Sequence, residues 1–342
     1  MSDLFDLYLY IVHWFLDAAL TVLETFGLGG GYIHRFVSWL VEEADLYLAA
    51  LLAAVVLVLW TLLTAALAAW TDRRVRARVQ GRAGPRHVGA FGLLQGLADW
   101  LKVMLKKRSG MPSAVPAGVS GALVLAALAL MPLGPWARLA DPDWALVVVT
   151  GLLALSPLPM AAMAPHGSRH SEMAEAVGSG TVLMLAAGSV MLVGGTARSG
   201  GLVDLQADSG WGLLLSPLGF LLLLVVMTWE SARLARVRST GTVRETWPGP
   251  HRALGLFTVA ARYFALGLLG TLLFLGGWLG PVEDGAWWTL LKAFVLVAFT
   301  SMVAGAMPLG RPAERASAVR ARYLPLATLN LVLVAAVLEV VG

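Results

Sequence analysis

Long apolar stretches recur along this chain and constrain its fold more than any other feature. A helix needs about 20 apolar residues to cross a lipid bilayer. Stretches of about that length lie near residues 47–70, 113–133, 143–164, 176–196, 212–229, 254–279, 286–307 and 323–341. Of the 342 residues, 58% are hydrophobic and 13% are charged, which leaves too little polar surface to cover a water-soluble globule. The sequence therefore predicts an all-α integral membrane protein with about eight transmembrane helices.

The distribution of Lys and Arg supports this number of spans. The connections 71–110, 165–175, 231–252 and 308–322 carry 20 of the 25 basic residues, and eight spans place all four connections on one side. The loops expected on the opposite side carry two, Arg138 and Arg198. Because basic loops remain in the cytoplasm, we expect a multi-pass protein of the bacterial inner membrane with cytoplasmic basic loops.

The first 45 residues differ from the rest of the chain. Asp6, His13, Asp17 and Glu24 are spaced so that they share one face of a helix. The sequence predicts two domains, an N-terminal amphipathic helical extension at 1–45 and an eight-helix membrane domain at 46–342. The extension is expected either to lie on the membrane surface or to span it with its polar stripe against a partner.

The chain contains no cysteine, which excludes disulfides, iron–sulfur ligation and thiolate metal sites. His166 and His170 are four residues apart and two glutamates follow them, a spacing that can ligate zinc on a helix. Pro165 and Gly167 argue against a helix at this point, so no metal site is predicted. A docking role and a path for protons remain alternatives for this segment.

The first basic loop has three physically distinct parts. Six arginines between 73 and 86 form a basic hinge, and Gly84, Pro85 and Gly89 impose an irregular backbone. Leucine and methionine then recur at helical spacing from Leu93 to Leu105, which predicts an amphipathic helix of about 17 residues at the membrane interface. Binding to anionic lipid headgroups alone would explain this composition.

The order of residues in this loop resembles the H subunit of respiratory complex I, the counterpart of a mitochondrial core subunit, and the chain is identified as a divergent member of that family. The matching residues are Asp72, Arg73, Gln80, Arg82, Gly84, Pro85, Val88, Gly89, Gly92, Leu93, Leu94, Gln95, Ala98, Asp99 and Lys102. Shorter matches follow in the same order at Pro217–Phe220, Glu230, Arg233, Phe274–Trp278, Lys292 and Leu324–Asn330.

The resemblance implies a function as a non-cofactor subunit of an NADH:quinone oxidoreductase, or of a related complex with another electron donor. Members of this family form a tunnel for the substrate, quinone, and a docking surface for an iron–sulfur arm. They bind no cofactor by themselves, and their partners are the other subunits and the lipid bilayer, not nucleic acid. The residues assigned to quinone binding or docking are Asp72, Arg73, Arg82, Arg86, Gln95 and Asp99.

The family also couples quinone chemistry to proton translocation through intramembrane carboxylates, and this chain departs from that pattern. Ser179 and Gly180 stand where the family has a Tyr-Glu pair, and Arg262 replaces the glutamate of an Ala-Glu-Tyr motif. The loop after Glu230 carries five arginines where the family has Ala-Pro-Phe-Asp-Leu-Pro-Glu. We therefore expect the proton-coupling residues to be partly lost.

Three charged residues inside spans are the candidates for a catalytic, proton-coupling role: Glu230, Arg262 and Lys292. An arginine in a span is costly and requires a partner, and Glu230, Glu172 or Glu175 could provide one. Lys292 lies near the end of its span, so it could instead extend its amine to the membrane surface.

Two other functions compete with the quinone-site assignment. The chain could be the homologous membrane anchor of a hydrogenase-type complex, or an adaptor that bridges arm and membrane without proton translocation. The complete Gly-Pro and Phe-Gly-Leu-Leu-Gln segments favour the quinone site, whereas the missing acids favour the adaptor. Co-purifying proteins and quinone labelling near Arg82 would discriminate among these functions.

Overall fold

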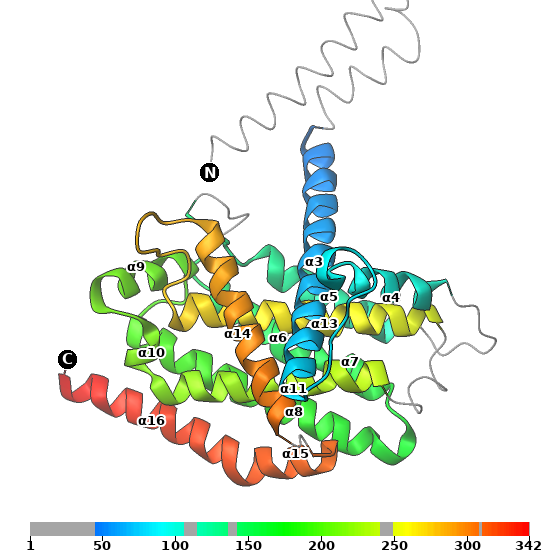
Figure 1. Ribbon diagram of the computed structural model, residues 1–342. Helices are drawn as coiled ribbons and strands as arrows, with labels where there is room; N and C mark the ends of the chain where they lie inside the picture. The colour runs from blue at the N-terminus through cyan, green and yellow to red at the C-terminus, as the bar shows by residue number, and fades with distance from the viewer. Residues whose placement is uncertain (1–44, 106–114, 136–141, 240–248, 308–309, 342) are drawn as a thin grey trace, which may run out of the picture. The chain divides into compact units, whose positions relative to one another are not determined.

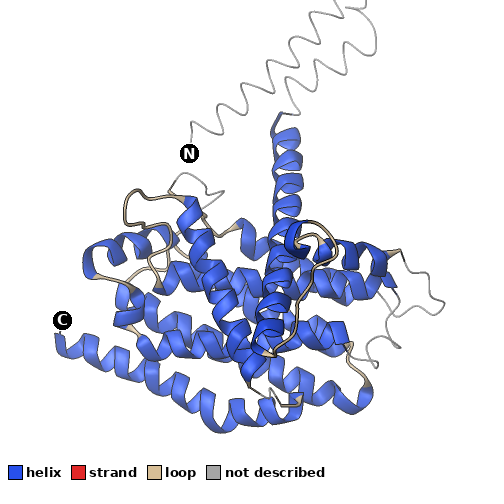
Figure 2. Cartoon of the chain, viewed as in Figure 1, coloured by secondary structure: helices blue, strands red, loops and turns tan. Residues whose placement is uncertain are grey.

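The computed structural model describes residues 45–105, 115–135, 142–239, 249–307 and 310–341. In this part of the chain the regular secondary structure is helical, without strands (Figure 2). Contacts divide the chain into two units, Met1–Trp60 and Thr61–Gly342. The predicted extension at 1–45 lies outside the described residues except for Asp45, where the first described helix begins.

Within the described residues, seven helical segments are long and apolar enough to cross a membrane. They are formed by α3 (Asp45–Val79), α6 and α7 (Ala145–Leu155 and Pro157–Ala162), α8 (His166–Gly194), α11 (Pro217–Ser239), α13 (Gly249–Phe274), α14 (Ala286–Ala306), and α15 with α16 (Pro312–Ala318 and Leu324–Val341). The predicted span at 113–133 corresponds to α5 (Val115–Ala129), an apolar helix of 15 residues. The all-α membrane fold is thus confirmed.

Short elements complete the described chain. They are η1 (Ala90–Gly92), α4 (Gln95–Met104), α9 (Ser199–Ser209), α10 (Gly212–Leu215) and η2 (Val319–Tyr323). Proline explains two of the irregularities. Pro157 has no N–H group to continue the hydrogen bonding of α6. Pro325 likewise lacks an N–H group, and the π-helical turn η2 lies directly before the helix that contains it.

Helix α13 lies at the centre of the second unit and packs against α14, α11, α5 and α4 (Figure 1). Glycine permits its close approach to two of these helices. A Cβ atom on Gly267 would lie 3.1 Å from the carbonyl oxygen of Ala293 on α14, and one on Gly270 would lie 2.8 Å from Leu223 on α11. Polar side chains on α13 therefore face neighbouring helices and not lipid.

The predicted interfacial helix is shorter than expected. It begins at Gln95 because the preceding residues Gly89, Phe91 and Gly92 all have positive φ angles, of 74°, 54° and 74°. Leu101 and Met104 are about half exposed, as a lipid-facing side would be. On the same helix, the Trp100 Nε1 donates a hydrogen bond of 2.8 Å to the carbonyl of Ala253 and thereby fastens α4 to α13.

The expectation that His166 and its neighbours are not helical is wrong. Helix α8 begins at His166, with Pro165 immediately before its first residue. The missing N–H of proline is no disadvantage at a helix start, where the first N–H groups have no partner within the helix. Among the described residues, no group of three or more His, Asp or Glu side chains could hold a metal ion.

Candidate functional site

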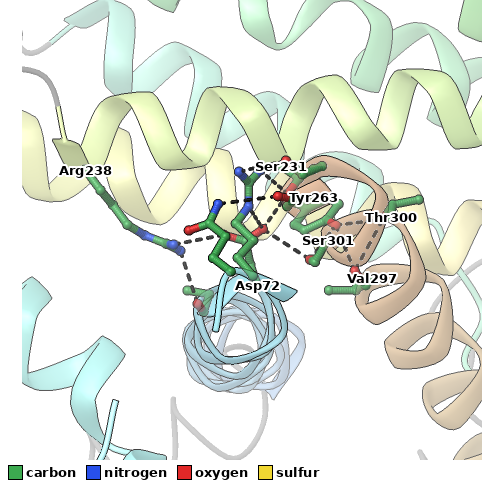
Figure 3. A network of polar contacts seen from close by, with 12 residues as sticks. Asp72, Ser231, Arg238, Tyr263, Val297, Thr300 and Ser301 are labelled. Carbon is green, nitrogen blue, oxygen red and sulfur yellow. Dashed lines mark hydrogen bonds and ion pairs between the residues drawn. The ribbon is translucent and has the colours of Figure 1, made fainter. Parts of the chain in front are cut away.

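The carboxylate of Asp72 is a junction between three helices (Figure 3). Asp72 is on α3 and fully buried, and it accepts hydrogen bonds from Arg76 Nε at 3.0 Å and Arg238 Nη1 of α11 at 3.0 Å. The hydroxyls of Ser231 on α11 and Ser301 on α14 also donate to it. A buried carboxylate is stable only with such partners, so this cluster both fixes the helices and concentrates charge near the loop end of α3.

The hydroxyl of Tyr263 brings α13 into the same cluster. It lies 2.9 Å from the carbonyl oxygen of Val297 and 2.7 and 2.9 Å from the hydroxyls of Thr300 and Ser301 on α14 (Figure 3). Because Ser301 also bonds Asp72, a continuous chain of hydrogen bonds joins α3, α11, α13 and α14. We call the residues of this chain the Asp72 network.

The segment after α3 is held by two arginines. Arg74 donates to the carbonyl of Phe91 at 2.7 Å and stacks near the rings of Trp70 and Phe91, with its guanidinium carbon 5.6 and 5.7 Å from their centres. Arg73 pairs with Asp99 of α4, and Asp99 also accepts a hydrogen bond of 2.8 Å from the side-chain amide of Gln95. These contacts hold the loop against α3 and bring together the loop residues that match the family pattern.

Two cavities meet at this segment. The first is narrow and mainly apolar, and it lies between α3, α4, α11 and α13, where its lining includes Ala66, Leu97, Trp100 and Phe257. The second is wider and more open, and about half of its lining residues are charged, so we call it the polar cavity. It is lined by Asp72, Arg73, Arg76, Ala77, Gln80, Arg82, Ala83, Gly84, Pro85, Ala235 and Arg238. Two charged side chains, Arg73 and Arg238, line both cavities, so the cavities are adjacent.

A second cluster of charges is buried between α8, α11 and α13. Arg262 has 2% of its surface exposed and pairs with Glu230. Glu230 also accepts a hydrogen bond of 2.9 Å from Arg233. Arg262 Nε donates to the carbonyl of Leu153 at 3.0 Å. The predicted need of Arg262 for an acidic partner is therefore confirmed, and the partner is Glu230. Glu230 Oε1 and Arg262 Nη2 are buried without a hydrogen-bond partner among the described residues.

This cluster continues toward the ends of the helices through two more acids. Glu175 of α8 is fully buried and lies 3.0 Å from Arg315 Nη2 and 3.4 Å from Arg233 Nη2. Glu172, one turn earlier, pairs with Arg236 at 2.6 Å. The acids Glu172, Glu175 and Glu230 and the arginines Arg233, Arg236, Arg262 and Arg315 form what we call the Arg262 cluster.

Lys292 binds the end of a neighbouring helix. Its Nζ donates to the carbonyl oxygens of Leu275, Gly277 and Leu279 at 2.7, 3.0 and 2.7 Å. These carbonyls lie in the turn that follows α13, which ends at Phe274. The amine also lies 5.6 Å from the ring centre of Trp211. Lys292 therefore fastens this turn to α14, a role that the sequence did not suggest.

The structure gathers most of the residues assigned to quinone binding or docking. Asp72, Arg73, Arg82 and Asp99 line one or both cavities, and Gln95 orients Asp99. Arg86 is exposed and lines neither cavity. Of the three candidates for proton coupling, Glu230 and Arg262 form an ion pair, whereas Lys292 binds the turn after α13.

Sequence reasoning did not single out three partners of these residues: Ser231, Arg238 and Ser301. Arg238 is one of five arginines in the predicted connection 231–252, whose basic composition the cytoplasmic preference of basic residues already explains. A hydroxyl in an apolar run gave the only signal for Ser301. Polar side chains in spans usually face other helices, but the sequence alone does not say which helix.

These features define a class: a multi-pass, all-α membrane protein with buried charge clusters and a polar cavity beside an amphipathic helix. Comparison with known proteins is consistent with this class. The sequence model of the family described as NADH dehydrogenase matches residues 52–335. The chain belongs to this family.

The curated relatives include H subunits of NADH-quinone oxidoreductases. The H subunit numbered 2 in Cereibacter sphaeroides is 29% identical over 310 residues, which cover 83% of this chain and 95% of the relative. The H subunit of Aquifex aeolicus is 29% identical, covering 78% and 90%, and that of Syntrophotalea carbinolica is 31% identical, covering 82% and 93%. The chain is thus a divergent relative of these H subunits, as its loop sequence predicted.

Proposed function

We propose that this chain is the membrane subunit of a complex I-type quinone oxidoreductase and forms the access path for quinone. The observation that carries the proposal is the pair of adjacent cavities that share Arg73 and Arg238 in their linings. The narrow apolar cavity suits a hydrocarbon tail, and the wider polar cavity suits a headgroup with hydrogen-bonding oxygens. The names of the curated relatives are consistent with this substrate.

We also propose that the basic loops lie in the cytoplasm and that the polar cavity faces an iron–sulfur arm. The exposed side chains of Arg82 and Arg86 project from the loop that borders this cavity. Arginine pairs with carboxylates in bidentate geometry, which suits docking to acidic surfaces. In this arrangement the arm carries the redox centres, and this chain supplies the path for the substrate.

The access path can be tested by blocking it. Ala66 lines the apolar cavity, so Ala66→Phe should lower quinone reduction by the assembled complex at least tenfold. Ala336 lies on the exposed side of α16, and Ala336→Phe is the matched control. If the assembled complex carried Ala66→Phe and still reduced quinone at the wild-type rate, the proposal would be contradicted. An affinity-tagged chain should also co-purify with iron–sulfur proteins of the arm.

A second candidate function is an arm-to-membrane link whose quinone site operates without proton translocation through the buried acids. The observation that favours it is the Arg262 cluster, where Glu175 and Glu230 contact arginine side chains. Arginine does not release a proton in proteins, so carboxylates separated by guanidinium groups form a poor relay. The complex in proteoliposomes should then reduce quinone without acidifying the lumen. Acidification abolished by Glu230→Gln would contradict this candidate.

A further inference from the structure

We propose that Arg238 is a binding residue for the quinone headgroup and that Asp72 positions it. The inference rests on the proposed quinone-access function and adds a residue that lies outside the loop motif. Arg238 is at the end of α11, and its side chain lines both the apolar and the polar cavity. A ligand with its tail in the first cavity and its ring in the second would lie beside this guanidinium.

The guanidinium of Arg238 is held in place but not fully used. Its Nη1 donates a hydrogen bond of 3.0 Å to Asp72 Oδ2 (Figure 3), and its Nη2 donates one of 3.2 Å to the carbonyl oxygen of Ala69. These two bonds engage two of the five N–H donors that a guanidinium carries. The side chain is 20% exposed and lines both cavities, so part of it faces the space that a ligand would occupy.

Asp72 can hold Arg238 in this position because its own geometry is fixed. Three further donors bind Asp72 Oδ1: Arg76 Nε and the hydroxyls of Ser231 and Ser301. The main chain of Arg238 is also held, because Arg252 Nη2 donates a hydrogen bond of 2.6 Å to its carbonyl oxygen. A guanidinium ordered before the ligand arrives loses little conformational entropy on binding.

The other arginine at the junction is less suited to this role. Arg73 is paired with Asp99, and the two side chains are 34% and 41% exposed. An exposed ion pair is screened by solvent and contributes little, whereas Arg238 is bonded to a fully buried acid. A quinone oxygen, and still more the anionic oxygen formed as the ring is reduced, is attracted by such a fixed positive charge.

The test compares Arg238→Gln and Arg238→Lys in the intact complex. The glutamine variant should raise the KM for a short-chain quinone about tenfold, with a smaller change in kcat, and the lysine variant should recover much of the loss because it restores the charge. Electron transfer from the donor to a water-soluble artificial acceptor should not change. Arg320→Gln is the control, since Arg320 is exposed and lines neither cavity. An unchanged KM in an assembled Arg238→Gln complex would overturn the proposal.

A second measurement uses wild-type protein and does not depend on the variants folding. A quinone that carries a photoreactive group on its ring should label the last turns of α11, near Leu234 and Ala235, which line the two cavities. Labelling confined to other cavity residues, such as those of α4, would reject Arg238 but leave the access path intact. Absence of labelling anywhere on this chain would reject the proposed function itself.

Discussion

At the scale of single residues, the most costly feature of this chain is a guanidinium inside a transmembrane helix. Arg262 is tolerated because Glu230 and the carbonyl of Leu153 bind it. Removing one member of a buried ion pair costs about 3–5 kcal/mol where the other charge is left unpaired. Glu230 would keep Arg233 as a partner, so the loss of Arg262 should cost less than this. Replacing both members by apolar groups avoids that cost.

Arg262→Ala should therefore lower the thermal denaturation midpoint of the purified complex and reduce the amount of assembled complex in the membrane. The double variant Glu230→Leu with Arg262→Met should recover part of this loss because both charges are removed together and Arg233 keeps Glu175 as a partner. Blue native electrophoresis and thermal unfolding measure both effects. If Arg262→Ala left assembly unaffected, the ion pair would have no structural importance.

Lys292 gives a second prediction for a single side chain. Lys292→Met keeps a similar length but leaves three carbonyls without their charged donor. Each unsatisfied buried group costs about 1–3 kcal/mol, so thermal stability should fall clearly. Lys292→Arg should be less damaging because it can still donate to carbonyls. A proton-coupling role would instead make Lys292→Met stable but impaired in turnover.

At the scale of elements, the turn between α3 and α4 depends on glycine at one position. Gly92 has a φ of 74°, and an added Cβ would collide with the main chain of Pro85. Gly92→Ala should therefore disturb the turn at a cost of at least about 1–2 kcal/mol and should impair quinone reduction. Gly118→Ala in α5 is the control, because no atom lies within 4 Å of an added Cβ there.

The elements also show what the sequence could predict. Apolar length located the spans, and the loop motif located the residues around the polar cavity. The length of α4 was overestimated because the leucine spacing includes Leu93 and Leu94, which precede the start of the helix at Gln95. The hydrogen bonds of Lys292 join residues that are 13 to 17 positions apart across a turn. Helical periodicity carries no information about such contacts.

At the scale of the whole molecule, the orientation in the membrane can be tested directly because the chain has no cysteine. Single cysteines can be introduced by Ala83→Cys in the basic loop and by Val282→Cys, at a site 87% exposed between α13 and α14. A membrane-impermeant maleimide should react with the first only from the cytoplasmic side and with the second only from outside. The reverse pattern would contradict the proposed topology.

The Arg262 cluster has a consequence for how the protein is made. A translocon inserts helices roughly in the order of synthesis, and an arginine at the middle of a span opposes insertion by about 2.5–3.5 kcal/mol. Helices α8 and α11, which carry Glu175 and Glu230, precede α13 in the chain. The acids are thus synthesised before Arg262, so α13 can partition into the bilayer next to a counter-ion. We expect biogenesis of this protein to depend on retaining α11 beside the translocon until α13 emerges.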